Sequence, residues 1–161
     1  EELGLAWEDT FYGKNRQEIE QHCAEKQIEL AWNDGVPRTM QTRSAILQHP
    51  VTGEEAWFNH VAFWHIANLP DAVRETMLAE VGIQGMPFNT YYGDGSEIPD
   101  EVARHIKDVQ LAAKRKFPWQ KGDFVIADNI LTCHGREPFS GDRIIRVSLL
   151  GQHNRPLFKP G

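Results

Sequence analysis

Apolar residues recur at helical spacing in three segments of the chain. In "NRQEIEQHCAEKQI", residues 15–28, they follow an asparagine that can cap a helix. The segments "PDAVRETMLAEVG", residues 70–82, and "IPDEVARHIKDVQLAAKRK", residues 98–116, place apolar residues three and four positions apart after a proline and an aspartate, which suit the first turn of a helix. We therefore expect a helix in each segment, with the loop "YYGDGSE" between the last two.

Shorter apolar runs predict strands in the first half of the chain. They are "IELAW" at residues 28–32, "MQTRSAILQHP" at residues 40–50 and "EAWFNHVAFW" at residues 55–64. The triplets "NDG", residues 33–35, and "TGE", residues 52–54, separate these runs and are typical of turns. The order of runs and turns therefore predicts consecutive short strands.

Two more strands are expected near the end of the chain. The run "FVIA", residues 124–127, follows a turn signal "KGD", and "RIIRVSLLG" at residues 143–151 is similarly rich in branched apolar residues. Short strands with helices inserted between them predict a mainly β fold of the α+β class. Because no internal repeat, low-complexity tract or linker divides the chain, we treat residues 1–161 as a single domain.

Composition narrows the classes of function. The chain has 161 residues, 40% of them hydrophobic, and a net charge of −6, with no basic run longer than "KRK", which disfavours a nucleic-acid partner. No apolar run approaches the roughly 20 residues that cross a bilayer, so no membrane partner is expected. The two cysteines, Cys23 and Cys133, lack the spacing of a zinc site or a disulfide framework, and a cytoplasmic location is the default expectation.

The final predicted strand contains two arginines. Side chains alternate faces along a strand, so Arg143 and Arg146 point in opposite directions. Their neighbours are too apolar for a fully exposed strand, and a partly buried guanidinium needs a partner such as a carboxylate, which it can bind with two parallel hydrogen bonds. An internal acidic residue, plain solvent or the carboxylate of a ligand could each satisfy this need.

A histidine, His134, lies a few residues before that strand. Neutral imidazole is the usual nitrogen ligand of divalent metals in proteins, although a lone histidine is more often exposed to solvent or hydrogen-bonded. Cys133 beside it would face the other way on an extended segment, so a thiol nucleophile is disfavoured. The candidate metal ligand is therefore His134.

These residues lie within sequence segments that occur together in one enzyme family. The segment "WQKGDFVIADNILTCHGREPFSGDRIIRV", residues 119–147, resembles the C-terminal signature of the iron(II) and 2-oxoglutarate dependent dioxygenases of the TauD/TfdA family. Upstream, "HPVTGEEAWFNHVAFWH" at residues 49–65 and "YYGDGSEIPDE" at residues 91–101 are similar to its SyrP-like branch. The matching segments together span most of residues 40–150.

The resemblance implies a double-stranded β-helix, or jelly roll, with helices in its insertions, and iron bound by two histidines and a carboxylate. It implies that His134 is the distal iron histidine and that Arg143 binds the far carboxylate of 2-oxoglutarate, with Arg146 as the second choice for that role. Asn59 matches an asparagine near the substrate, although an amide that satisfies backbone groups at a strand end is an equal alternative. Asp128 matches a turn position that holds the His134 segment.

The chain departs from the family pattern in one respect. The first metal motif, His-X-Asp or His-X-Glu, is absent, because none of the seven histidines is followed two positions later by an acidic residue. We therefore expect the chain to be the C-terminal portion of a dioxygenase domain that lacks its N-terminal strands. Such a portion carries one protein ligand of iron and should be inactive alone, since iron affinity requires several converging donors. Its main partner would be the missing N-terminal portion of the same domain.

The predicted activity is that of an oxygenase with Fe(II) as cofactor and 2-oxoglutarate as co-substrate. The resemblance implies hydroxylation of an amino acid or a similar small molecule, free or attached to a carrier protein, in specialised metabolism. Two alternatives stay open. A small residue in place of the missing carboxylate would indicate a halogenase of the same superfamily, and a metal-free jelly-roll binding module would share only the scaffold.

Overall fold

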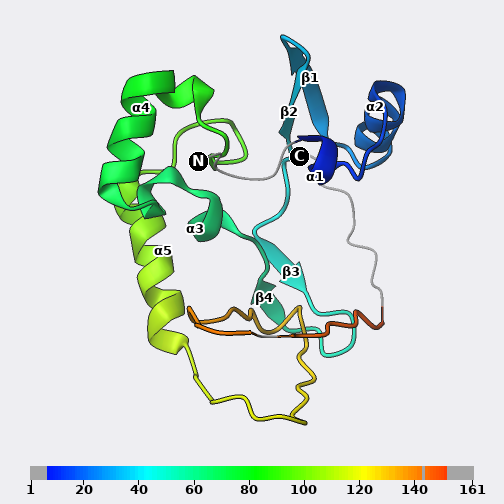
Figure 1. Ribbon diagram of the computed structural model, residues 1–161, viewed down its shortest axis with the longest axis vertical. Helices are drawn as coiled ribbons and strands as arrows, with labels where there is room; N and C mark the ends of the chain where they lie inside the picture. The colour runs from blue at the N-terminus through cyan, green and yellow to red at the C-terminus, as the bar shows by residue number, and fades with distance from the viewer. Residues whose placement is uncertain (1–6, 143, 152–161) are drawn as a thin grey trace. The chain divides into compact units, whose positions relative to one another are not determined.

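The computed structural model describes residues 7–142 and 144–151, and the chain divides into two compact units. The first unit comprises residues up to Thr42 together with Asn59–Asp123, and the second comprises Arg43–Phe58 together with the chain from Phe124 onward. Figure 1 shows the course of the chain through both units. Among the described residues, none of the helices combines the length and the apolar character needed to span a membrane.

The first unit opens with two helices, α1 (Trp7–Thr10) and α2 (Arg16–Glu25). The predicted cap of α2 is confirmed, because the Asn15 side chain accepts a hydrogen bond from the backbone N–H of Glu18 at 3.0 Å. The Glu18 carboxylate in turn accepts one from the N–H of Asn15 at 2.8 Å. This reciprocal capping box satisfies two backbone donors that a helix start leaves unpaired.

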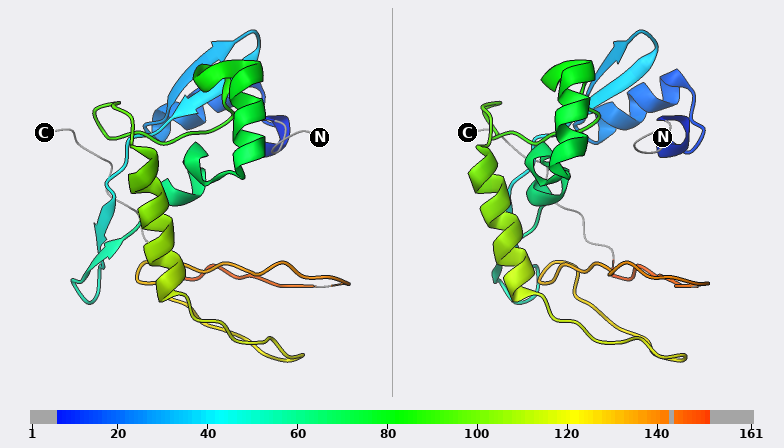
Figure 2. Two further views of the ribbon diagram at one scale, coloured as in Figure 1. Left: turned by 90° about the vertical axis from the view of Figure 1, so that its left-hand side faces the viewer. Right: turned by 60° about the vertical axis from the view of Figure 1, so that its left-hand side comes forward.

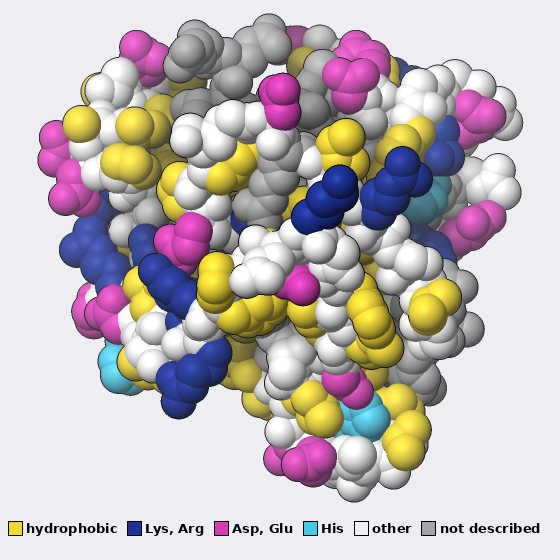
Figure 3. Space-filling view, turned by 60° about the horizontal axis from the view of Figure 1, so that its bottom comes forward, with side chains coloured by type: hydrophobic (Ala, Val, Ile, Leu, Met, Phe, Trp, Pro, Cys, Tyr) yellow, Lys and Arg dark blue, Asp and Glu magenta, His cyan; other side chains and the backbone are white. Residues whose placement is uncertain are grey.

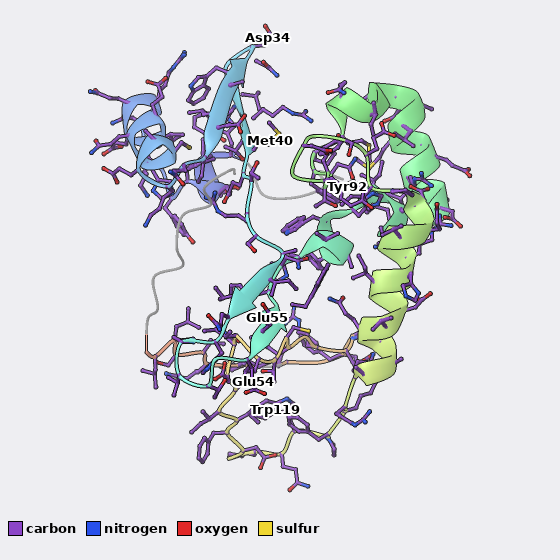
Figure 4. All side chains as sticks on the ribbon, turned by 180° about the vertical axis from the view of Figure 1, so that it is seen from behind. Asp34, Met40, Glu54, Glu55, Tyr92 and Trp119 are labelled. Carbon is purple, nitrogen blue, oxygen red and sulfur yellow. The ribbon has the colours of Figure 1, made fainter. Side chains whose placement is uncertain are left out.

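A β-hairpin follows α2. Strand β1 (Glu29–Asn33) pairs in antiparallel register with β2 (Val36–Met40). The predicted turn is confirmed: Asp34 and Gly35 both have positive φ angles, 49° and 82°, as a two-residue hairpin turn requires. Figure 4 shows Asp34 at the tip of this hairpin. The extended segment predicted over residues 40–50 is only partly observed: Met40 is the last residue of β2, and within the rest of the segment Ile46–Gln48 forms a strand.

The other helices of the first unit pack around a small apolar core. They are α3 (Val61–Trp64), the 3-10 helix η1 (Ile66–Asn68), α4 (Asp71–Gly85) and α5 (Asp100–Ala113). The core consists of Ala67, Ile98 and Ala103, against which Val61 and Val102 pack. Both long helices begin one residue after a proline, as predicted from the sequence.

Two local predictions for this unit need correction. The chain was expected to be extended to residue 64, but Val61–Trp64 is helical: the Asn59 side chain accepts the N–H of Val61 at 3.0 Å, and His60 O accepts that of Trp64 at 3.0 Å. The helix predicted to end at Gly82 continues to Gly85 after a break at Gly82, whose φ of 64° is outside the helical region.

The second unit contains a short antiparallel hairpin of β3 (Ile46–Gln48) and β4 (Glu55–Trp57). Residues 49–54 connect the strands, and the predicted turn at "TGE" is confirmed: His49 N–H donates to Glu54 O at 2.7 Å, and Gly53 has a φ of 76°. Figure 4 shows Glu54 and Glu55 at this end of the hairpin. The connection holds the side chain of His49 inside the unit, where it is 8% exposed.

The strands predicted at residues 124–127 and 143–151 are not present among the described residues. The described residues after the turn at Asp128 instead run as two extended stretches lying side by side (Figure 2), without the ladder of hydrogen bonds that defines a sheet. Extended backbone becomes a strand only when a neighbour supplies these bonds, and apolar composition does not identify that neighbour. Helices outweigh strands in the described residues, so the α+β class is observed there but the expected predominance of β-structure is not, and the jelly roll stays a prediction.

Candidate functional site

Two residues that were predicted from the sequence to bind the metal or the co-substrate are described by the structure, and both lie in the second unit. His134 and Arg146 are exposed there. Arg143, the first choice for the 2-oxoglutarate clamp, lies outside the described residues. Asn59 belongs to the first unit, and its side-chain oxygen accepts a backbone hydrogen bond at the start of α3. That contact is the backbone-satisfying role weighed for Asn59 from the sequence, and its substrate role stays a prediction.

Asp128 organises the turn that leads to His134. One carboxylate oxygen, Oδ1, accepts the backbone N–H groups of Ile130 at 2.9 Å and Leu131 at 3.1 Å. The backbone oxygen of Asp128 accepts the N–H of Thr132 at 2.9 Å and its hydroxyl at 2.6 Å. Three consecutive backbone donors are thus directed at one residue, which is the Asx-type use of aspartate in turns. The turn ends two residues before His134.

The second carboxylate oxygen of Asp128 is bound by a histidine from the β3–β4 hairpin. Nε2 of His49 lies 2.9 Å from Oδ2 of Asp128. The other ring nitrogen, Nδ1, accepts the N–H groups of Val51 at 3.3 Å and Thr52 at 3.0 Å. A nitrogen that accepts carries no proton, so the proton is on Nε2 and the neutral ring donates to Asp128. Both ring nitrogens and both carboxylate oxygens are therefore engaged.

The hydrogen bonds at Asp128 also determine its protonation. The backbone N–H groups of Leu131 and Ile130, and to a smaller extent His49, hold the pKa of the Asp128 carboxyl below its ordinary value of 3.8. Asp128 is therefore ionised at neutral pH and acts purely as an acceptor. This is the protonation state in which it can accept the turn amides and His49 together.

A similar arrangement occurs in the first unit, where both ring nitrogens of His65 form hydrogen bonds to backbone groups. His65 is 4% exposed; its Nδ1 accepts the N–H of Ala67 at 3.1 Å and its Nε2 lies 3.0 Å from the backbone oxygen of Ile98. The ring thereby connects η1 to the segment that precedes α5. No charged partner is involved, in contrast to His49.

The described residues offer an incomplete donor set for iron. Within them, no group of three or more histidine, cysteine, aspartate or glutamate side chains is placed to hold a metal ion. His134 provides one exposed imidazole, whereas a two-histidine, one-carboxylate site needs three convergent ligands. Further ligands would have to come from residues outside those described.

Sequence reasoning assigned Asp128 a structural role but missed its partner. His49 opens the word "HPVTGEE", and Asp128 belongs to "ADN", two of the segments that carried the family resemblance. The two residues are 79 positions apart in the sequence, so no local pattern predicts their contact.

Comparison with known proteins assigns the chain to a family. The model of the family described as taurine catabolism dioxygenase TauD, TfdA family, matches residues 7–149, and the chain belongs to this family. One relative, the dapdiamide synthesis protein DdaC of Enterobacter agglomerans, is 44% identical over 91% of the chain, which corresponds to 45% of that protein. A clavaminate synthase-like protein of Arabidopsis thaliana is 24% identical over 91% of the chain and 42% of its own length.

The chain thus spans less than half the length of these relatives. No solved structure matches it significantly. The predicted family is confirmed by these matches, and the assignment to the SyrP-like branch stays a prediction.

Proposed function

We propose that the chain is the part of an Fe(II) and 2-oxoglutarate dependent oxygenase that supplies one iron ligand and the anchor of the co-substrate. The observation that carries this proposal is the family match over residues 7–149, which includes the whole segment around His134 and Arg143. Iron with 2-oxoglutarate and dioxygen supplies the oxidation of an unactivated carbon, a step that side chains cannot perform. The other iron ligands would come from the N-terminal portion of the domain.

Within this proposal each residue has a definite task. The imidazole of His134 binds iron, and the guanidinium of Arg143 binds the distal carboxylate of 2-oxoglutarate, with Arg146 as the alternative anchor. The exposure of His134 and Arg146 in the second unit is compatible with groups that bind something outside that unit. Asn59 is proposed to contact the substrate.

The relatives support a proposal for the substrate class. DdaC is a dapdiamide synthesis protein, and the segments at residues 49–65 and 91–101 resemble the SyrP-like branch. We therefore propose hydroxylation of an amino acid or a similar small molecule, free or tethered to a carrier protein, in specialised metabolism. Chloride-dependent formation of a halogenated product would instead assign the chain to the halogenases.

The test uses the polypeptide expressed from its complete reading frame. Anaerobic addition of 2-oxoglutarate to the Fe(II)-loaded protein should produce a weak visible charge-transfer band, and His134→Ala should abolish it. Arg143→Ala should raise the 2-oxoglutarate concentration at half-saturation at least about tenfold, because a bidentate charged hydrogen bond contributes roughly 1.5–3 kcal/mol. Arg146→Ala is the matched control. If Arg146→Ala has the larger effect, the two arginines exchange roles.

One observation favours a second candidate function. The absence of a His-X-Asp/Glu triplet is what a metal-free jelly-roll module would show. The same titration separates the two, since a module of that kind gives neither the band nor any binding of 2-oxoglutarate. That result would contradict the oxygenase proposal.

A further inference from the structure

The contact between His49 and Asp128 connects two distant parts of the second unit. His49 is buried at 8% exposure, whereas the Asp128 side chain is 44% exposed. The histidine ring is fixed on one side by the N–H groups of the hairpin connection and on the other by the carboxylate. A buried ring with both nitrogens bonded has little freedom to rotate, so it holds the carboxylate in one position.

Asp128 in turn restrains the backbone that leads to the proposed iron ligand, His134. The carboxylate and the backbone oxygen of Asp128 bind the N–H groups of Ile130, Leu131 and Thr132. These bonds define the conformation of the backbone up to two residues before His134. A displacement of the Asp128 carboxylate would therefore change the position from which the His134 imidazole projects.

We propose that His49 is a positioning residue for the iron site: through Asp128 and its turn, the buried imidazole sets the direction of the His134 side chain. This inference rests on the proposed function, because it assumes that His134 binds iron. Groups that orient a metal ligand through hydrogen bonds typically change metal affinity about ten- to a hundredfold when removed. His49 would act in this way through a turn, without contact with the ligand itself.

Two substitutions of His49 separate the connection to Asp128 from local effects. In His49→Asn the amide oxygen can replace Nδ1 as acceptor for Val51 and Thr52, but nothing replaces Nε2–H. In His49→Gln the amide N–H can reach toward Asp128, while the Nδ1 acceptor is lost. The proposal predicts that His49→Asn weakens Fe(II) binding at least about tenfold and shifts the charge-transfer band, and that His49→Gln restores most of both.

His65→Asn is the matched control. His65 is a buried histidine with an equivalent pair of bonds, but it connects elements of the first unit. Its substitution should lower the thermal unfolding temperature to a similar extent and leave the position of the band unchanged. Asp128→Asn, at a half-exposed position, is a milder variant that should reproduce the band shift if His49→Asn does not fold.

Amide hydrogen exchange needs no bound metal, so it tests the positioning role of His49 separately from the proposed oxygenase function. Amide hydrogen exchange of Ile130, Leu131 and Thr132 should accelerate at least about tenfold in His49→Asn and stay unchanged in His65→Asn. Unchanged exchange, or an intact band with unaltered iron affinity in His49→Asn, would overturn the positioning role. A wild-type protein without the band would contradict the oxygenase proposal instead, whatever the exchange rates.

Discussion

At the scale of single residues, three histidines that look alike in the sequence have different surroundings. His49 and His65 are buried with both ring nitrogens bonded, whereas His134 is exposed. A buried neutral ring with two partners is satisfied and is not available to a metal. The exposed imidazole of His134 can reach a ligand outside the unit. The backbone that leads to it is held by the hydrogen bonds of Asp128.

The pKa of Asp128 leads to a prediction about acid. Because the pKa in the folded chain is below the ordinary 3.8, the ionised carboxylate stabilises the turn fully above that value. This stabilisation is lost as the pH falls through the lower, folded-state pKa. Exchange of the Ile130 and Leu131 amides, corrected for the intrinsic pH dependence, should therefore accelerate only below about pH 4.

The variant Asp128→Asn provides the control for this acid transition. Its amide cannot titrate, so exchange at Ile130 and Leu131 should be faster than in the wild type near neutral pH and should show no step on acidification. A wild-type midpoint well above 3.8 would contradict the assignment, because it would require a carboxyl whose charged form is disfavoured in the folded state.

At the scale of elements, the sequence predicted helices better than strands. The start of α2 was readable from Asn15, and α4 and α5 begin directly after prolines, since caps and first turns depend on neighbours in sequence. Residues 124–127 and 143–151 have strand-like composition, yet the described residues there form no sheet. A strand requires backbone partners that are distant in sequence, and no local pattern supplies them. The contact of His49 with Asp128 was missed for the same reason.

The capping box of α2 offers a quantitative test at this scale. Asn15→Ala removes the side-chain acceptor of the Glu18 N–H, and it should lower the free energy of unfolding by about 1 kcal/mol, measured by urea denaturation. Asn15→Ser retains an oxygen acceptor and should recover most of the loss. If alanine and serine were equivalent, the cap would not contribute to stability.

At the scale of the whole molecule, the notable feature is apolar surface in the second unit. Hydrophobic side chains reach the surface of the protein in many places (Figure 3), and several in this unit are almost fully accessible. The most exposed of those described are Val51 at 86%, Phe124 at 81%, Ile126 at 88%, Ile144 at 87%, Leu149 at 81% and Leu150 at 88%. Each large apolar side chain left in water forgoes roughly 1.5–3 kcal/mol of burial, so a cover for this surface would be strongly stabilising.

We propose that the N-terminal portion of the same domain provides that cover, since the chain spans less than half the length of its relatives. The 161-residue chain alone should then bind a hydrophobic dye such as ANS more strongly than the polypeptide from its complete reading frame. In the complete polypeptide, Ile144→Ser and Leu149→Ser should restore dye binding and destabilise the fold, whereas in the chain alone they should reduce dye binding. Val51→Ser, at an exposed position of the hairpin connection, is the control and should have little effect on either. Equal dye binding by the chain and the complete polypeptide would contradict this proposal.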